Sequence, residues 1–414
     1  MQGLIKQKLG LLLLGIFTFI LPFNAYSSLA LAAQVSSPKS SDFRVLGNKI
    51  YSPDGKQFIA EGISVFGGLE DSNYMVNIPN IRAQIEAAVK FWHTNTIRLQ
   101  VAESNLFSRG INSQYNEKFL KQIINEVNFA RRLNQVVVIN DQTEFTNNSP
   151  SPTIMTSKFW YVIGKTFSKD PYVIFDLFNE PRLDSLNAHK TSRRENLALG
   201  FLKLKRITHK RRHVNFSTNP AKIWSIWKYG GYVNSVHYVG MQTLVNQIRN
   251  RGVNNLIWVE SPYWGQRLPP SKQYLITGNN VVYSYHHINL NYPSGWQSIG
   301  MFSKNHAVVD GEWSQYQSPW AECYSHAPLN TPKYLRFLQT NKIGLIAWSL
   351  QAGSLIKGNP RIIPSNVNSL IDTKNPNSLR IPSRFSRHYS CNRHFGYGAG
   401  KLIMKYFLAN SSPI

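Results

Sequence analysis

The chain has 414 residues, 42% of them hydrophobic and 13% aromatic, which is enough apolar material for a large folded core. Its 46 Lys and Arg against 21 Asp and Glu give a formal net charge of +25, which favours anionic partners such as envelope polymers or nucleic acid. Two cysteines cannot build a zinc site and no H-E-x-x-H spacing occurs, so the sequence argues against metal catalysis.

The first 33 residues have the layout of a secretory signal peptide. Lys6 and Lys8 precede an apolar run over 9–23, and small residues follow up to Ala33. The run is short for a membrane span, so we expect cleavage and export to the periplasm or the medium. An uncleaved membrane anchor is the alternative. Residues 34–42 are polar and rich in serine, which predicts a linker, and 43–414 would form a single domain.

Strand-like and helix-like segments alternate along that domain. The apolar runs that predict strands are 58–65, 96–101, 136–139, 173–178, 256–259, 281–285, 307–310 and 344–348. Helical spacing of apolar residues occurs around 81–92, 116–133, 159–167, 241–248, 334–338 and 401–408. Strands that are apolar throughout and separated by helices predict an α/β fold with a parallel sheet covered by helices. Eight such strands predict a closed (β/α)8 barrel, the TIM barrel.

A long segment, 183–238, interrupts the alternation after the fourth strand. Within it, residues 189–213 hold nine Lys or Arg against the single acid Glu195. No nucleic-acid-binding motif surrounds this cluster, so it predicts a solvated basic insertion and no nucleic-acid partner. Electrostatic contact with anionic envelope polymers stays open.

Two of the predicted strands run into carboxylates that form a candidate catalytic pair. The fourth strand is followed by Asn179, Glu180 and Pro181, and the seventh by Glu312. Burial at a strand end raises the pKa of a glutamate and suits it to general acid catalysis, although a solvated glutamate at a loop start is the alternative. The carboxyl ends of barrel strands meet at one face, and two carboxylates facing each other there are what glycoside hydrolysis requires.

The ordered motifs resemble those of glycoside hydrolase family 5, a group of retaining (β/α)8 enzymes that includes endoglucanases and mannanases. The motifs are Asn95-Thr96-Ile97-Arg98, Phe178-Asn179-Glu180-Pro181, Tyr285-His286, Gly311-Glu312 and Ala347-Trp348. The resemblance implies that Glu180 is the acid/base and Glu312 the nucleophile. It further implies four supporting residues: Arg98 keeping Glu312 ionised, Asn179 at the sugar 2-hydroxyl, His286 in the hydrogen-bond network, and Trp348 as a stacking floor. A purely structural role is the alternative for Arg98, His286 and Trp348.

The sequence departs from the family pattern at two strand ends. Gln142 stands where a histidine is usual after the third strand, so this substrate contact would be uncharged. Ile288 stands where the usual His-x-Tyr has its tyrosine, so that group is absent unless Tyr283, Tyr285, Tyr292 or a residue elsewhere replaces it. Glu260, at the end of the fifth strand, is an extra carboxylate for which we expect a supporting or substrate contact.

Aromatic residues follow both motif glutamates. Trp313, Tyr316 and Trp320 come after Glu312, and Trp224 and Trp227 lie in the segment after Glu180. Each group is a candidate sugar-binding platform, with local packing as the alternative. An aromatic-rich rim favours endo-acting cleavage of a polymer.

Taken together, these features predict a secreted, monomeric, retaining endo-β-glycanase that cuts β-1,4-glucan and needs no cofactor. Mannan or another β-linked hemicellulose is the alternative substrate, and a non-catalytic basic barrel that binds anionic envelope polysaccharide is the alternative function. In an exported chain, Cys323 and Cys391 would form a disulfide.

Overall fold

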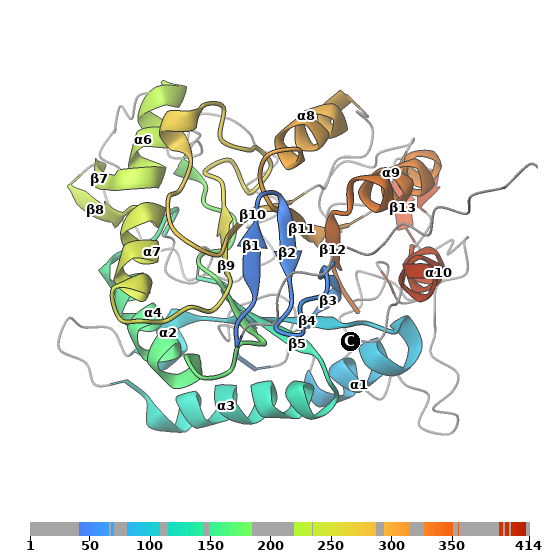
Figure 1. Ribbon diagram of the computed structural model, residues 1–414, viewed down its shortest axis with the longest axis horizontal. Coiled ribbons are helices and arrows are strands. Elements are labelled where there is room, and N and C mark those ends of the chain that lie inside the picture. The colour runs from blue at the N-terminus through green and yellow to red at the C-terminus, as the bar shows by residue number, and fades with distance from the viewer. Residues whose placement is uncertain are drawn as a thin grey trace, which may run out of the picture. The chain divides into compact units, whose positions relative to one another are not determined.

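Eight parallel strands close into a barrel in the computed structural model (Figure 1). In spatial order they are β3 (Glu61–Val65), β4 (Thr96–Val101), β5 (Val136–Asp141), β6 (Val173–Asp176), β9 (Ile257–Glu260), β10 (Val281–Tyr285), β11 (Val308–Trp313) and β12 (Gly344–Ala347). Pairing of Leu345 in β12 with Glu61 in β3 closes the ring. All eight predicted strands are confirmed, with ends that move by up to three residues.

The structure describes residues 41–65, 68–69, 81–107, 115–143, 149–183, 219–233, 235–286, 294–314, 327–350, 355, 389–391, 394–396 and 399–410. All of them belong to one compact unit, Ser36–Ile414. The predicted signal peptide and most of the basic segment after β6 lie outside these residues, so both stay predictions. Among the described residues, no helix is long and apolar enough to cross a bilayer.

Two apolar clusters pack the barrel, one inside it and one around it. The inner cluster includes Val136, Leu256 and Ala307, which lie at or just before strand starts. Phe43 and Ile50 join it from the hairpin of β1 (Arg44–Leu46) and β2 (Lys49–Tyr51), so this hairpin closes the amino end of the barrel. The strands are therefore buried on both faces, which explains their continuous apolar sequences.

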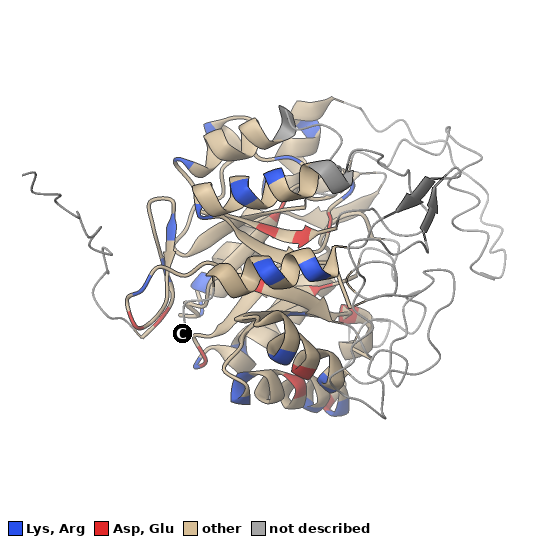
Figure 2. Ribbon diagram, turned by 90° about the vertical axis from the view of Figure 1, so that its right-hand side faces the viewer, with Lys and Arg blue, Asp and Glu red and all other residues tan. Residues whose placement is uncertain are grey.

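The outer cluster lies between the strands and a ring of helices (Figure 1). These helices are α1 (Ile81–Trp92), α3 (Glu117–Arg132), α4 (Ile154–Phe167), α7 (Met241–Arg249), α8 (Ser294–Ser303), α9 (Ala327–Asn341) and α10 (Gly400–Asn410), with the short α2 (Glu103–Leu106) and the 3-10 turn η2 (Lys272–Tyr274) beside them. Sequence signals fix several helix starts: the Asn116 side chain accepts from Phe119 N–H, and Thr153 forms a capping box with Thr156. Figure 2 shows Lys and Arg on these helices, while acidic residues also lie on the strands within.

The segment after β6 contains structure that the sequence pattern did not predict. Helix α6 (Pro220–Tyr229) is capped by Asn219 and leads into the hairpin of β7 (Gly230–Val233) and β8 (Val236–Val239). Trp224 and Trp227 lie in α6 and are 4% and 1% exposed. They are packed against the barrel and are not sugar platforms, which corrects the expectation for this pair.

A second small hairpin pairs β13 (Tyr389–Cys391) with β14 (His394–Gly396) near the end of the chain. Its backbone places Cys391 in a strand. The predicted partner, Cys323, lies outside the described residues. The disulfide therefore stays a prediction.

Candidate active site

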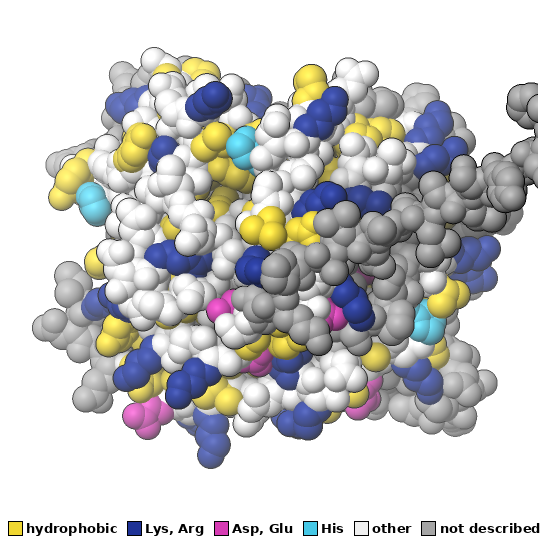
Figure 3. All heavy atoms as spheres, viewed as in Figure 1, with side chains coloured by type: hydrophobic (Ala, Val, Ile, Leu, Met, Phe, Trp, Pro, Cys, Tyr) yellow, Lys and Arg dark blue, Asp and Glu magenta, His cyan; other side chains and the backbone are white. Residues whose placement is uncertain are grey.

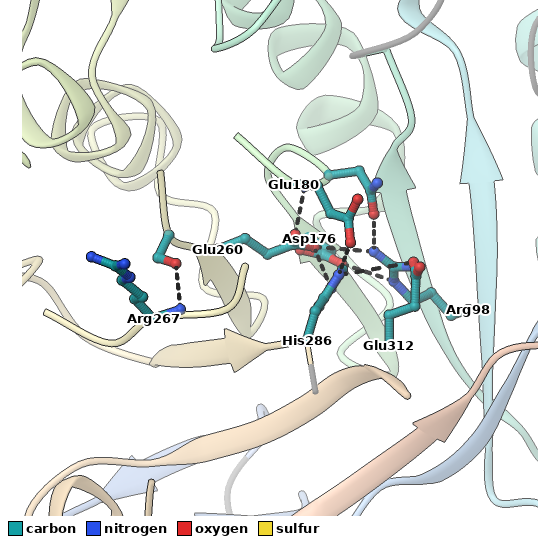
Figure 4. Close-up of polar contacts among 9 residues, drawn as sticks. Arg98, Asp176, Glu180, Glu260, Arg267, His286 and Glu312 are labelled. Atoms are coloured by element: carbon teal, nitrogen blue, oxygen red, sulfur yellow. Dashed lines mark hydrogen bonds and ion pairs between the residues drawn. The ribbon is translucent and has the colours of Figure 1, made fainter. Parts of the chain in front are cut away.

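Charged side chains from five barrel strands, or from the turns after them, converge at the carboxyl ends of the strands (Figure 4). They are Arg98 in β4, Asp176 in β6, Glu180 after β6, Glu260 in β9, His286 after β10 and Glu312 in β11. The alternation of side chains along a strand places Ile174 and Asp176, and likewise Trp258 and Glu260, on the inner face. The inner face is thus apolar at the bottom of the barrel and charged at its mouth.

Arg98 links the cluster together from a fully buried position. Its Nε donates to Asp176 Oδ2 at 3.0 Å, and its Nη1 donates to Glu312 Oε2 at 2.9 Å. Its Nη2 donates to Asn179 Oδ1 at 2.7 Å and to Glu260 Oε1 at 3.1 Å. The flat guanidinium can serve several acceptors in fixed directions, so one side chain sets the positions of four groups.

Glu180 lies four residues beyond the end of β6, and not at the last position of a longer strand as the sequence suggested. Leu177 and Phe178 are fully buried, and Leu177 N–H donates to Trp258 O at 3.1 Å, which holds the turn against β9. Glu180 has a φ of +44°, a left-handed conformation that is unfavourable for a residue with a side chain. Its N–H donates to Glu260 Oε2 at 2.6 Å, a contact that fixes this turn.

A bulge in β11 turns Glu312 into the barrel mouth. Asp310 pairs with Leu345 and Trp313 with Ala347, so β11 has one more residue than β12 between these pairs. The extra residue lets both Asp310 and Trp313 face outward, where Tyr334 donates to Asp310 at 2.6 Å and Trp313 joins the outer cluster. Glu312 consequently faces inward, which is a recognised use of bulges beside active sites.

His286 is surrounded by carboxylates. Its Nδ1 lies 3.0 Å from Glu180 Oε1 and 4.0 Å from Glu312 Oε2, and its Nε2 lies 3.1 Å from Glu260 Oε1. The contact between His286 Nε2 and Glu260 is short enough for an ion pair, but its angles are not those of a hydrogen bond. Burial alone would lower the pKa of His286, but Glu260, Glu312 and Glu180 outweigh it and raise this pKa well above its usual value. These carboxylates therefore favour the imidazolium form of the ring.

The pKa values of Glu312, Asp176 and Glu260 are shifted in different directions. Burial raises the pKa of Glu312 to about 7, although His286 and Arg98 act to lower it. The expected effect of Arg98 on Glu312 has the right direction, but burial outweighs it. Burial and the charge of Glu260 raise the pKa of Asp176 to about 8. The pKa of Glu260 is lowered in spite of its burial, because His286, Arg98 and the Glu180 N–H stabilise its charge.

Glu180 and Glu312 are the two acids of the cluster that the mouth exposes. Their side chains are 10% and 11% exposed, whereas those of Arg98, Glu260 and His286 have no exposure. A carboxylate oxygen of Glu180, one of Glu312 and a ring nitrogen of His286 all lie within 4.8 Å of one another. Three such atoms are close enough to share a metal ion, but Arg98 Nη1 already donates to Glu312 Oε2 at 2.9 Å, so we assign no metal to them.

The remaining predicted residues have different surroundings. Gln142 follows β5 and is buried, with its N–H donating to Val101 O at 2.9 Å. Trp348 follows β12 and is partly buried, and its N–H donates to Trp313 O at 2.7 Å. Trp313 has no exposure, so it is core and not a sugar platform. Trp320, Tyr316, Ile288 and Tyr292 lie outside the described residues.

Neither tyrosine of β10 replaces the tyrosine that the family pattern has at position 288. Tyr283 and Tyr285 both belong to the outer apolar cluster, so their side chains point away from the barrel interior. Glu312 is instead contacted by Arg98 at 2.9 Å and lies 4.0 Å from His286. Asp176 is a site residue that the sequence pattern did not single out. A single acid in an otherwise apolar strand was the signal that could have identified it.

Comparisons with known proteins agree with this fold. The family model for cellulase, glycosyl hydrolase family 5, matches residues 51–354. The catalytic domain of Thermobifida fusca endoglucanase Cel5A is similar in structure, with a TM-score of 0.55 and 13% identity over 89% of this chain and 97% of that one. No curated protein matches the sequence.

Two further solved structures are similar at comparable levels. The β-glucanase SdGluc5_26A from Saccharophagus degradans has a TM-score of 0.53 and 16% identity, over 78% of this chain and 89% of that one. A hyperthermophilic endocellulase from the archaeon Pyrococcus horikoshii has a TM-score of 0.52 and 16% identity, over 76% and 93%. These identities show a common fold, and the family match covers most of the chain. The chain belongs to glycosyl hydrolase family 5.

Proposed function

We propose that the protein is a secreted, retaining endo-β-glycanase that hydrolyses β-1,4-glucan, with Glu180 as acid/base and Glu312 as nucleophile. The observation that carries this proposal is that one carboxylate oxygen of Glu180 and one of Glu312 lie within 4.8 Å of each other. Retaining glycosidases hold their two carboxyl groups about 5–5.5 Å apart, whereas inverting enzymes need about 6.5–9.5 Å to admit a water. The gap between Glu180 and Glu312 suits direct attack on the sugar.

The reaction would proceed in two displacements. Glu312 attacks the anomeric carbon while Glu180 gives its proton to the glycosidic oxygen, which leaves as the new sugar end. Glu180, now ionised, then takes a proton from water, and the resulting hydroxide displaces Glu312 from the sugar. The contact of Glu312 with Arg98 supports this assignment of roles, because Arg98 stabilises the charge of Glu312 before attack and again on release.

Asn179 would bind the sugar during both steps. Its Oδ1 accepts from Arg98 Nη2 at 2.7 Å, which orients the amide with its NH2 group as the donor end. A donor at this position suits the sugar 2-hydroxyl, where hydrogen bonds strengthen in the transition state. Trp348 would supply an apolar surface for the adjacent ring.

The preference for β-1,4-glucan is supported by the similar structures. The Thermobifida fusca endoglucanase and the Saccharophagus degradans β-glucanase were both solved in complex with cellotetraose. A further similar structure is described as an endogalactoceramidase, with a TM-score of 0.53 and 16% identity over 74% of each chain. The fold thus accommodates other sugars, and mannan or another hemicellulose is the alternative substrate.

Export and envelope binding form part of the same proposal. The signal-peptide layout of residues 1–33 supports secretion. Lys and Arg outnumber Asp and Glu on the face in Figure 3, and the chain carries a net charge of +25, with a basic insertion predicted at 185–213. Such a surface would hold the enzyme near anionic envelope polymers, and its binding should weaken as salt increases.

A digestion panel tests the function. The purified protein is incubated with β-1,4-glucan, mixed-linkage glucan, mannan and xylan, and the lengths of the products are measured. We expect internal cleavage of β-1,4-glucan and a loss of at least about 10³-fold in kcat for both Glu180→Gln and Glu312→Gln. Activity near that of the wild type in either variant, with its fold intact by circular dichroism, would refute the assignment of that residue.

A further inference from the structure

Glu260 is a fully buried carboxylate that touches three parts of the site. Its Oε2 accepts the Glu180 N–H at 2.6 Å, and its Oε1 lies 3.1 Å from both Arg98 Nη2 and His286 Nε2. Because its side chain has no exposure, it cannot meet a substrate in this arrangement. It is also an acid additional to the two glutamates of the proposed mechanism. We therefore expect Glu260 to act through the residues that it contacts.

One of those contacts holds the main chain of the proposed acid. Glu180 adopts a left-handed backbone, which persists only where surrounding contacts over-determine it. The hydrogen bond from its N–H to an ionised, buried carboxylate is a strong contact of this kind. Glu260 thus fixes the direction in which the Glu180 side chain leaves the backbone.

A second contact holds the side chain of the same acid through His286. Both ring nitrogens of His286 face carboxylate oxygens, Nδ1 toward Glu180 and Nε2 toward Glu260. An ionised carboxylate accepts hydrogen bonds and does not donate them, so the ring must be protonated at Nε2 to face Glu260 favourably. When the ring is protonated at both nitrogens, Nδ1–H donates to Glu180 Oε1, which leaves Oε2 as the oxygen that carries the transferable proton.

The charged groups around His286 and Glu260 also favour the doubly protonated form of the His286 ring. His286 faces Glu180 from the turn after β6, Glu260 from β9 and Glu312 from β11. Glu260 in turn faces Arg98 from β4 and, at longer range, Asp176 from β6. The pKa of Glu260 is lowered, whereas those of Glu312 and Asp176 are raised, so Glu260 is the permanent counter-ion of the imidazolium.

We propose that Glu260 is a positioning residue: it holds His286 in its doubly protonated form and clamps the Glu180 main chain, so that one oxygen of Glu180 is reserved for proton transfer. This inference rests on the proposed role of Glu180. The competing view is that Glu260 serves only as an ion-pair partner of Arg98. That view predicts a loss of stability on substitution, with no change in the titration of His286.

Glu260→Gln separates the two views. The amide oxygen can still accept from Glu180 N–H, but the NH2 group then faces both Arg98 and the His286 ring, and a donor cannot satisfy a protonated Nε2. The ring must lose that proton to accept from the amide. Glu61→Gln is the matched control, because Glu61 is a buried glutamate of β3 whose side chain contacts Asn410 and not the site.

The first readout is the titration of histidine by NMR, with the His286 signal assigned through its absence in His286→Gln. In the wild type and in Glu61→Gln we expect His286 to stay protonated at pH 8. In Glu260→Gln its pKa should fall by at least about one unit. An unchanged titration in Glu260→Gln overturns the inference. If that variant does not fold, a wild-type His286 that titrates near its ordinary value of about 6.5 overturns it instead.

The second readout is kinetic. We expect kcat of Glu260→Gln to fall by at least about tenfold while KM changes less than about twofold, because a neutral His286 stabilises the carboxylate that Glu180 becomes on proton transfer less well, and the substrate contacts are intact. The basic limb of its kcat profile should move to lower pH as His286 loses its proton. A profile with the wild-type shape would contradict the inference. The NMR readout needs no substrate, so it stands even if Glu180 and Glu312 prove not to be the catalytic pair.

Discussion

Replacing Arg98 with methionine removes the charge that balances the buried acids while keeping a side chain of similar length. Arg98 has no exposure and donates to Asp176, Glu260 and Glu312 at 2.9–3.1 Å. Removing one partner of a buried ion pair costs about 3–5 kcal/mol, since it leaves an uncompensated charge in the interior. We therefore expect Arg98→Met to lower the free energy of unfolding by at least about 3 kcal/mol at pH 8.

The size of this effect should depend on pH in a defined direction. Already in the wild type, burial raises the pKa of Glu312 to about 7 and that of Asp176 to about 8, far above their values in the unfolded chain. Loss of Arg98 raises both pKa values further, so the folded variant binds more protons than the unfolded chain. Its stability is then greatest at low pH and is lost as pH rises through the folded pKa values. The penalty should be smaller at pH 5 than at pH 8.

Urea unfolding at both pH values measures this difference. Lys56→Met is the control, because the Lys56–Asp54 pair lies at the surface, with side chains that are 57% and 34% exposed. Such a pair contributes about 0–1 kcal/mol. A penalty below about 1 kcal/mol for Arg98→Met, or one equal at pH 5 and pH 8, would refute the argument that Arg98 balances the buried acids.

Two further predictions concern β11. Because the pKa of Glu312 is about 7 and the nucleophile must be ionised, kcat/KM should rise as pH increases through about 7, and a pH–rate profile with its acid limb below pH 5 would contradict this. Gly311→Ala should destabilise the fold by about 1–3 kcal/mol, since a Cβ there would overlap Ser284 Oγ. In helix α4, Gly164→Ala meets no atom within 4 Å and should be neutral or stabilising. Thermal unfolding of both variants checks this contrast, and equal effects would count against it.

The barrel was predictable because its strands are buried on both faces. Continuous apolar runs locate such strands directly, and β4 (Thr96–Val101) has the bounds expected from its sequence. The fourth strand was predicted too long, since Leu177 and Phe178 are as buried in the turn as they would be in a strand. Burial and an apolar sequence alone do not distinguish the end of a strand from a buried turn.

The aromatic platforms were less predictable. Trp224, Trp227 and Trp313 follow the two motif glutamates in sequence, but all three are buried against helices or strands. Whether a tryptophan faces a cleft or the core depends on neighbours far along the chain, such as the stacking of Trp224 on Tyr274. Sequence position beside a motif carries no such information.

The details of the site depend on register and on contacts between distant strands. The inward direction of Glu312 comes from a bulge that is defined by pairing with β12, which the sequence of β11 does not reveal. Glu260 could be recognised as a carboxylate at a strand end. Its contacts with Arg98, His286 and the Glu180 N–H required the closed barrel.

The most direct test of the proposed mechanism is to trap its covalent intermediate. An activated 2-deoxy-2-fluoro β-glycoside of the preferred sugar slows both displacements, and its excellent leaving group lets the first one proceed, so the glycosyl-enzyme should accumulate. After proteolysis, mass spectrometry should find one sugar on the peptide that contains Glu312, and none on that peptide in Glu312→Gln. A label on Glu180 or Glu260, or turnover of substrate with inversion at the anomeric carbon, would contradict Glu312 as the nucleophile.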